Sequence, residues 1–327
     1  MRLSSGSQAS RLGSVPLPAR CELCPRRCGA DRAHGERGQC GAADELRVAR
    51  AALHYWEEPP ISGTAGSGAV FFSHCPLRCV YCQNLEISQG VRRGDGHVVA
   101  GKDITVERLA RIFLELQNQG ALNINLVTPT HYRLQIAEAL RRAKGEGLRL
   151  PVVYNTSGYE TVASIRALEG LVDVFLTDFK YVSPALARRL SAAPDYFEVA
   201  SAALEAMVEQ VGPYTLSETA DESGGCPPLA RGVIVRHLML PGQLDDSKAV
   251  VRHVFGHFGD DVCLSLMNQY TPRRYDAAFR DLSREVTEEE YSELIDFALE
   301  LGVVNSFMQE GGTAEESFIP AFDATGV

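Results

Sequence analysis

Short apolar runs alternate with longer stretches of helical periodicity along most of the chain, from residue 69 onward. The short runs are rich in β-branched and aromatic residues and end at glycine, proline or polar residues, which is typical of buried strands. We predict strands at residues 69–72, 123–128, 151–155, 174–179, 233–240 and 262–267. We predict helices near residues 106–119, 132–144, 160–168, 196–210, 246–257 and 288–301. Six strands that alternate with helices predict an α/β fold with an all-parallel sheet and right-handed crossovers.

The chain before this region has a different character. Residues 1–20 contain three arginines, several serines and no acid, which predicts a disordered tail, with a transit peptide as the alternative. Residues 21–64 are predicted to form a cysteine-rich module with connecting strands, because residues 46–56 alternate loosely between apolar and polar. Residues 65–327 form the predicted main domain, with a polar, acidic loop insertion near residues 213–230.

Three cysteines follow the first predicted strand within eight residues: Cys75, Cys79 and Cys82. Thiolates that lie this close together suit an iron–sulfur cluster. Three ligands on a four-iron cluster leave one iron without a protein ligand, and an open metal position usually indicates chemistry. The alternative is one helix face with three inert thiols, but Pro76 fits poorly inside such a helix.

Four more cysteines lie near the N-terminus: Cys21, Cys24, Cys28 and Cys40. Their segment is short and rich in glycine, so it has little hydrophobic core of its own, and a metal is the usual substitute. Four cysteines can close a zinc site or hold a second iron–sulfur cluster. We favour an accessory cluster that relays electrons, followed by structural zinc and then by free thiols.

The composition of the chain indicates the compartment in which these thiols act and the kinds of partner to expect. Seven of the nine cysteines lie before residue 83, which fits metal sites in a reducing compartment such as the cytoplasm better than disulfides. Cys226 lies alone in the loop insertion and receives no role, whereas Cys263 is expected in the core. The net charge of −10 argues against nucleic acid as the main partner. No apolar run approaches the ~20 residues that span a membrane.

The pattern Cys-x-x-x-Cys-x-x-Cys, with Tyr81 before the third cysteine, resembles the radical S-adenosylmethionine (radical SAM) superfamily. Tyr81-Cys82-Gln83-Asn84 is similar to the pyruvate formate-lyase activating enzymes. The N-terminal pattern Cys-x-Leu-Cys-Pro-x-x-Cys-Gly and residues 309–313 resemble the uncharacterised PflX-type proteins. The resemblance implies a partial six-repeat (β/α)6 TIM-like barrel, a 4Fe-4S cluster, SAM, and an electron donor such as flavodoxin or ferredoxin.

The resemblance also implies which strand ends hold SAM. Where the superfamily usually has Gly-Gly-Glu, this chain has Thr128-Pro129-Thr130-His131, and both threonines could supply oxygens for the amino group of SAM. His131 is either a helix-start residue or a direct participant. Asn155 and Ser157 resemble a Thr-Asn-Gly segment that hydrogen-bonds a sugar or a carboxylate, although a helix cap needs the same residues.

Charged residues complete the expected site. By resemblance, Asp178 accepts from the ribose hydroxyls and Lys180 meets the methionine carboxylate, with a structural salt bridge as the alternative. Arg236 could neutralise a carboxylate, and Tyr81 is counted among the cofactor-binding residues. The histidine that the activating enzymes place after the sixth strand is absent from residues 268–272.

Three functions remain open at this point. SAM bound at the open iron would be cleaved reductively to a 5′-deoxyadenosyl radical, which abstracts hydrogen from a substrate. That step would either install a glycyl radical on a partner enzyme or modify a small molecule or another protein. A non-catalytic iron–sulfur electron carrier is the third alternative and the weakest, because a carrier needs four ligands and no nucleotide site.

Overall fold

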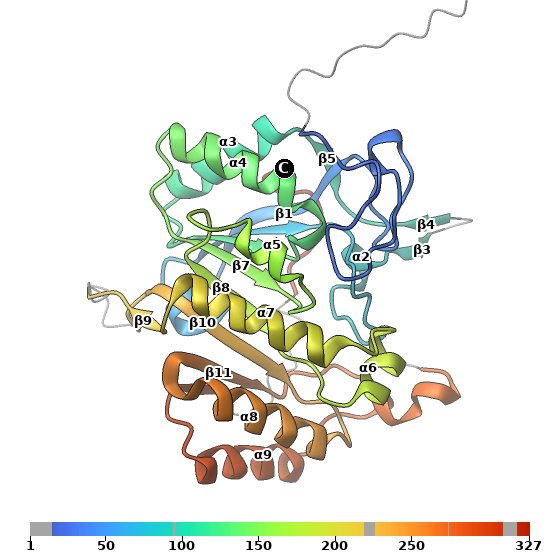
Figure 1. The fold of residues 1–327 in the computed structure, drawn as a ribbon, viewed down its shortest axis with the longest axis vertical. Coiled ribbons are helices and arrows are strands. Elements are labelled where there is room, and N and C mark those ends of the chain that lie inside the picture. Colours follow the sequence, from blue (N-terminus) through green and yellow to red (C-terminus); the bar gives the residue numbers. More distant parts are fainter. Residues whose placement is uncertain (1–14, 94–95, 219–225, 274, 310–318) are drawn as a thin grey trace, which may run out of the picture.

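The computed structural model describes residues 15–327 except 94–95, 219–225, 274 and 310–318. Its centre is a ten-stranded sheet with the order β12-β11-β10-β8-β7-β6-β2-β1-β5, and β9 pairs with β10 (Figure 1). The strands from β2 to β12 along this path pair in parallel, whereas β1 and β5 add antiparallel pairs at one edge. The strands of this sheet are β1 (Leu46–His54), β2 (Ser67–Phe72), β5 (Lys102–Ile104), β6 (Ile124–Val127), β7 (Val152–Thr156), β8 (Val174–Asp178), β9 (Thr215–Leu216), β10 (Leu229–Leu238), β11 (Val262–Met267) and β12 (Ser306–Met308). A separate hairpin joins β3 (Val91–Arg93) and β4 (Gly96–Val98).

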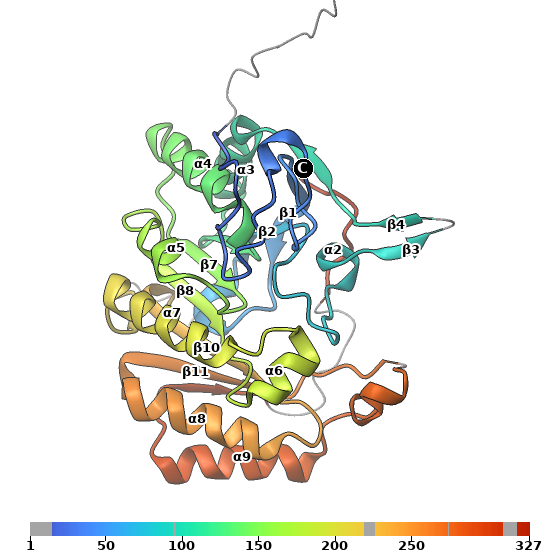
Figure 2. The same ribbon diagram turned by 45° about the vertical axis from the view of Figure 1, so that its right-hand side comes forward.

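Helices cover the outer face of the curved sheet (Figures 1 and 2). They are α3 (Val106–Asn118), α4 (Arg133–Gly145), α5 (Val162–Arg166), α6 (Pro184–Ser191), α7 (Tyr196–Val211), α8 (Leu244–Phe258) and α9 (Glu288–Leu301). The short helices α1 (Pro59–Ser62) and α2 (Leu85–Ser88) precede and follow β2 in the chain. Turns of 3-10 helix occur at Arg32–His34, Thr130–Tyr132, Gly259–Asp261 and Ala277–Ser283. In the described part of the chain no helix is both long and apolar enough to cross a membrane.

Strand alternation divides the core into two faces. Val153, Val174 and Ile234 pack with Cys263 on the inner face of the sheet, where Ile61 from α1 joins them. The neighbouring positions on the same strands face outward and pack in a larger cluster with the helices. Polar residues at the inner positions of the strand ends are therefore directed into the hollow of the sheet, not toward the helices.

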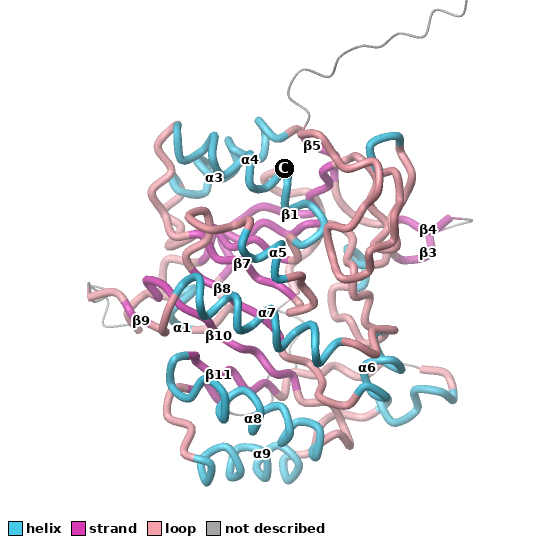
Figure 3. Tube along the Cα trace, viewed as in Figure 1, coloured by secondary structure: helices cyan, strands magenta, loops and turns pink. Residues whose placement is uncertain are grey.

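The predicted α/β fold is confirmed: the six predicted strands are β2, β6, β7, β8, β10 and β11, and the mostly parallel sheet is consistent with a partial TIM-like barrel. Residues 46–56 contain β1, which pairs with β2 as well as β5, so this strand belongs to the main sheet. The segment before β1 is mostly loop (Figure 3). Most of the predicted tail, the centre of the insertion near 213–230 and most of residues 309–313 lie outside the described residues.

Candidate active site

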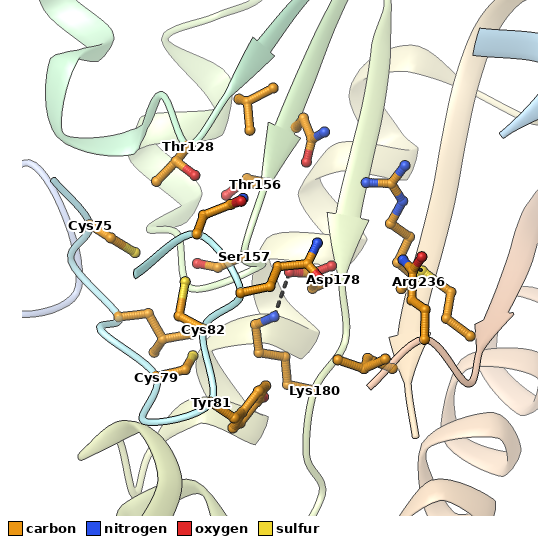
Figure 4. Close-up of a pocket in the computed structure, with 18 of the residues that line it drawn as sticks. Cys75, Cys79, Tyr81, Cys82, Thr128, Thr156, Ser157, Asp178, Lys180 and Arg236 are labelled. Carbon is orange, nitrogen blue, oxygen red and sulfur yellow. Dashed lines mark hydrogen bonds and ion pairs between the residues drawn. The ribbon is translucent and has the colours of Figure 1, made fainter. Parts of the chain in front are cut away.

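Most of the predicted site residues line one pocket at the carboxyl ends of the parallel strands (Figure 4). The loop after β2 and the ends of β6, β7, β8 and β10 contribute to its wall. The predicted residues that line it are Cys75, Cys79, Tyr81, Cys82, Thr128, Asn155, Ser157, Asp178, Lys180 and Arg236. The predicted residues that lie elsewhere are Thr130, Cys21, Cys24, Cys28 and Cys40.

The cluster loop, residues 75–82, and the residue before it include backbone conformations that residues other than glycine rarely adopt. His74 and Arg78 have φ angles of 72° and 55°, in the left-handed region. Neighbouring helices hold the loop in place, because His74 donates its N–H to the Ile87 carbonyl at 2.6 Å and Val80 donates to Leu190 at 2.9 Å. Backbone strain that is fixed by its surroundings is frequent at functional sites.

The three thiols of this loop fit an iron–sulfur cluster. Burial is the main cause that raises the pKa of Cys75 to about 12, and the nearby thiols of Cys79 and Cys82 contribute to this rise because adjacent thiolates repel one another. A metal offsets both penalties by withdrawing charge from the sulfurs. Among the described residues, no group of three or more Cys, His, Asp or Glu side chains is arranged to hold a single metal ion. A cluster has a different requirement, since each thiolate binds its own iron.

Hydroxyl groups reach two of these sulfurs. Ser88 donates to Cys82 Sγ at 3.3 Å, and Ser191 donates to Cys79 Sγ at 3.1 Å. Ser191 is also connected to the pocket wall. The Tyr181 hydroxyl is hydrogen-bonded to the Ser191 hydroxyl at 2.9 Å and to the hydroxyl of Tyr81, which lines the pocket, at 2.6 Å. Hydrogen bonds to the sulfurs that hold a cluster shift its reduction potential, so these hydroxyls would tune the potential of a cluster bound here.

Asp178 and Lys180 form an ion pair across the pocket from the thiols, with 2.6 Å between Oδ2 and Nζ (Figure 4). Burial acts to lower the pKa of Lys180, but the Asp178 carboxylate outweighs it and holds that pKa well above its usual value. The ends of β7 and β8 approach closely here, because a Cβ at Gly158, where φ is +76°, would lie 2.2 Å from the Asp178 carbonyl oxygen. Only glycine fits that position.

Arg236 is engaged by two carboxylates that the sequence reasoning did not identify. Its guanidinium contacts Glu57 and Glu58, with Nε donating to Glu58 Oε1 at 2.7 Å. Asn125 and Asn155 donate to Glu57 Oε1 at 2.8 and 3.4 Å. From the sequence, Glu57 and Glu58 were interpreted only as part of a break in the chain before the prolines. The available signal was two adjacent acids shortly after β1.

The threonines after β6 point in different directions. Thr128 lines the pocket and has a φ angle of 60°, a conformation that glycine adopts more readily. Thr130 instead donates to Glu160 Oε1 at 2.6 Å, as Thr156 does at 2.8 Å. Burial raises the pKa of Glu160 to about 7, although these hydroxyls act to lower it.

His131 is buried beside this threonine and lies outside the pocket. Its Nε2 is 2.8 Å from the Ser73 carbonyl oxygen, and burial lowers its pKa to about 3. A neutral ring in this position braces the start of the cluster loop, because Ser73 lies directly after β2.

The N-terminal cysteine segment, residues 21–40, closes on itself. Cys21 donates its N–H to the Ala30 carbonyl and accepts from Gly29, both at 3.0 Å. Cys21, Cys24 and Cys40 are buried and Cys28 is exposed. A Cβ at Gly38 would lie 3.4 Å from the sulfurs of both Cys28 and Cys40, so these two side chains converge on one point. Burial raises the pKa of Cys24 to about 12.

Arg26 fastens this segment to the cluster loop. Its guanidinium donates to the carbonyl oxygens of Pro76 at 2.9 Å and Leu77 at 3.2 Å. It also donates to the carbonyls of Ser191 at 2.7 Å and Ala192. One side chain therefore connects the N-terminal cysteine segment, the cluster loop and the end of α6.

Comparisons with known proteins agree with this geometry. Residues 69–219 match the Radical SAM superfamily, a stretch that begins in β2 and includes the cluster loop. An uncharacterized protein of Methanocaldococcus jannaschii is 29% identical over 282 residues, which cover 85% of this chain and 74% of that protein. The match supports a radical SAM domain in residues 69–219, and that domain implies a 4Fe-4S cluster, SAM and, in general, a SAM-dependent radical reaction.

Proposed function

We propose that this chain is a radical SAM enzyme in which Cys75, Cys79 and Cys82 hold a 4Fe-4S cluster. The observation that carries the proposal is that these three thiols and the Asp178–Lys180 ion pair line the same pocket. When bound and reduced, the cluster would supply the electron that cleaves SAM. The chain's own contribution is to bind and orient the cofactors and to limit access of water.

We assign the SAM-binding roles by position in the pocket. Asp178 accepts from the ribose hydroxyls and Lys180 meets the carboxylate, which its stable positive charge favours. Thr128, Asn155 and Ser157 offer oxygens and N–H groups from neighbouring strand ends, and Tyr81 forms part of the wall. We assign Arg236 to support of the wall, because two carboxylates of this chain share its guanidinium, and Thr130 because it lies outside the pocket and donates to Glu160.

Two classes of reaction partner are compatible with this pocket. Installation of a glycyl radical, as in the pyruvate formate-lyase activating enzymes, and modification of a small molecule or another protein both fit a pocket that holds SAM. A flavodoxin or ferredoxin in a reducing compartment such as the cytoplasm would supply the electron. A non-catalytic electron carrier fits less well, since it has no use for the Asp178–Lys180 pair beside the thiols.

We also propose that Cys21, Cys24, Cys28 and Cys40 hold a metal. Two of their sulfurs converge at Gly38, and the segment has few apolar residues with which to fold. A second iron–sulfur cluster would relay electrons. Zinc would only stabilise the segment, and it fits less well because no three of the described Cys, His, Asp or Glu side chains are arranged around a single ion.

The test measures SAM cleavage directly. Anaerobically reconstituted protein with dithionite and SAM should form 5′-deoxyadenosine, detected by mass spectrometry. Asp178→Ala should weaken SAM binding by ~1–3 kcal/mol and leave iron content unchanged, since a hydrogen bond to a charged group is lost. Cys226→Ser, which alters a cysteine outside the pocket, serves as the control. Cluster-loaded protein that never forms 5′-deoxyadenosine would refute the proposal.

A further inference from the structure

Arg32 is buried inside the N-terminal cysteine segment, away from the candidate SAM pocket, and only 1% of it is exposed. Its Nε donates to the Ala43 carbonyl oxygen and its Nη1 donates to the His131 carbonyl oxygen, both at 2.7 Å. The third nitrogen, Nη2, is buried and has no hydrogen-bond partner among the residues that the structure describes. Buried donors in native proteins are nearly always satisfied, so Nη2 indicates a partner that the polypeptide alone does not supply.

The charge of Arg32 also lacks an opposite charge. A guanidinium stays protonated in proteins, and a buried charge is costly unless an opposite charge lies nearby. No acid pairs with Arg32 in the described part of the chain. The neighbouring Asp31 meets His34, with 2.8 Å between Oδ2 and Nδ1. Glu45 pairs with Arg37, with 2.9 Å between Oε1 and Nη1.

An aromatic ring compensates only part of this cost. The Tyr132 ring lies below the guanidinium, with 5.8 Å between its centroid and the Arg32 Cζ. Aromatic faces attract cations, but the ring is neutral and forms no hydrogen bond with Nη2. A further partner with negative charge is therefore expected beside Arg32.

The four cysteines of the segment are the groups in a position to supply that charge. Burial raises the pKa of the Cys40 thiol, whereas the charge of Arg32 acts to lower it, so these two side chains interact. Cys21 and Cys28 act on the same thiol. Burial also raises the pKa of Cys24, with smaller contributions from Cys40 and Cys21. The four thiols therefore interact as one group, and Arg32 interacts with it.

This group carries negative charge only when it holds a metal or loses its protons in another way. Protonated thiols are neutral and would leave Arg32 without an opposite charge. Metal binding requires thiolates. Four thiolates carry more negative charge than the positive charge of one divalent ion or one four-iron core. A metal centre on these cysteines would therefore be anionic.

We propose that Arg32 is the counter-charge of an anionic metal–thiolate centre held by Cys21, Cys24, Cys28 and Cys40. The inference rests on the second metal site of the proposed function and adds a residue that is not a ligand. Arg32 stabilises the loaded centre through its charge, and Nη2 remains as a donor for it. Groups that surround the ligands of a metal commonly change its affinity by 10- to 100-fold.

The alternative is that Arg32 only braces the backbone. Its bonds reach Ala43 and His131, and His131 Nε2 in turn lies 2.8 Å from the Ser73 carbonyl oxygen, just before the cluster loop. A brace needs the donors of Arg32, whereas a counter-charge needs its charge. Arg32→Lys keeps the charge with a different donor geometry. Arg32→Gln keeps an amide donor without the charge.

The test measures metal retention in the full-length chain. Cys75, Cys79 and Cys82 are replaced with Ser, so that all bound metal belongs to the N-terminal segment. One preparation is reconstituted anaerobically with ferrous iron and sulfide, and another with zinc. Each is titrated with EDTA, and the retained metal is measured by elemental analysis. Arg32→Gln should release the metal at an EDTA concentration at least tenfold lower than the parent, whereas Arg32→Lys should stay within about threefold of it.

Two further variants complete the design. Arg37→Gln removes the same charge from the same segment at a side chain that is 63% exposed, and it should retain the metal as the parent does. Arg32→Met has no charge and no polar group to bury, so it separates the loss of charge from misfolding of Arg32→Gln. It should release the metal as readily as Arg32→Gln.

The inference would be overturned if retention did not depend on charge at position 32. Equal release from Arg32→Lys and Arg32→Gln would make Arg32 a brace, and unchanged retention in Arg32→Gln and Arg32→Met would give it no role at the metal. In both cases the second metal site would stand. A parent chain that retains no metal at the four cysteines would instead refute that site and this inference together. SAM cleavage by protein with Cys75, Cys79 and Cys82 intact is independent of all these outcomes.

Discussion

The molecule has two groups of cysteines, and their surroundings differ. The cluster loop follows a strand of the main sheet, and its thiols line a pocket together with an ion pair. The N-terminal cysteine segment has no strand, is closed by its own backbone bonds and lies outside that pocket. We therefore expect the two groups to serve different purposes. The thiols that border the pocket would serve the chemistry, whereas those of the N-terminal segment would bind a metal that relays electrons or orders the chain.

The strongest test of this comparison removes each group in turn. Replacing Cys75, Cys79 and Cys82 together with Ser should abolish SAM cleavage and remove one cluster, while the metal at the other group remains. Replacing Cys21, Cys24, Cys28 and Cys40 with Ser should remove only the second metal. Iron, sulfide and zinc analysis of both variants gives the result. Loss of all metal from either variant alone would mean that the two groups do not act as separate sites.

Glu160 offers a second test, because it lies between the two groups. It accepts from Thr130 and from Thr156, and its charge adds to the effect of burial, which is the main cause of the raised pKa of Cys24. A carboxyl whose pKa is raised by folding binds protons more tightly in the folded state, so the stability it confers is lost as pH rises. Its folded pKa of about 7, against an ordinary value of 4.5, predicts that the free energy of unfolding falls by roughly 3 kcal/mol between those pH values.

The measurement is denaturant unfolding across this pH range. Glu160→Gln should flatten that part of the profile, because an amide does not titrate. Glu138→Gln, at a surface ion pair, should keep the parent slope. An unchanged slope in Glu160→Gln would show that the buried carboxyl does not control this pH dependence.

A third test weakens the link between the groups without touching any thiol. Arg26→Ala removes donors from the Pro76, Leu77 and Ser191 carbonyls, and we expect a loss of stability of about 2 kcal/mol. The cluster signal in electron paramagnetic resonance should also change, because the loop that carries the thiols loses its brace. Arg27→Ala, at the exposed neighbouring position, should do neither. Identical spectra for both variants would show that the segment does not position the loop.

Sequence periodicity was enough to predict the central strands and the cluster loop, because each strand and the cysteine spacing are local features. The short helix α6 (Pro184–Ser191) was missed, although Ser183 caps it and Pro184 occupies its first turn. Glu57 could not be paired with Arg236 from sequence, because their contact depends on how two distant strands lie across the sheet. Thr130 was assigned to the pocket, but the 3-10 turn at Thr130–Tyr132 directs its hydroxyl toward Glu160.

The contacts of Arg26 also determine where the chain can be truncated. A chain shortened to begin at residue 65 would keep all of the residues that match the radical SAM domain. It would nevertheless lose β1, which would leave β2 as an unprotected edge, and it would lose the donor to the carbonyls of the cluster loop. The boundary that the sequence places near residue 64 therefore separates two compositions but not two independently folding parts. Any shortened form that is meant to bind cofactors should retain residues 21–64.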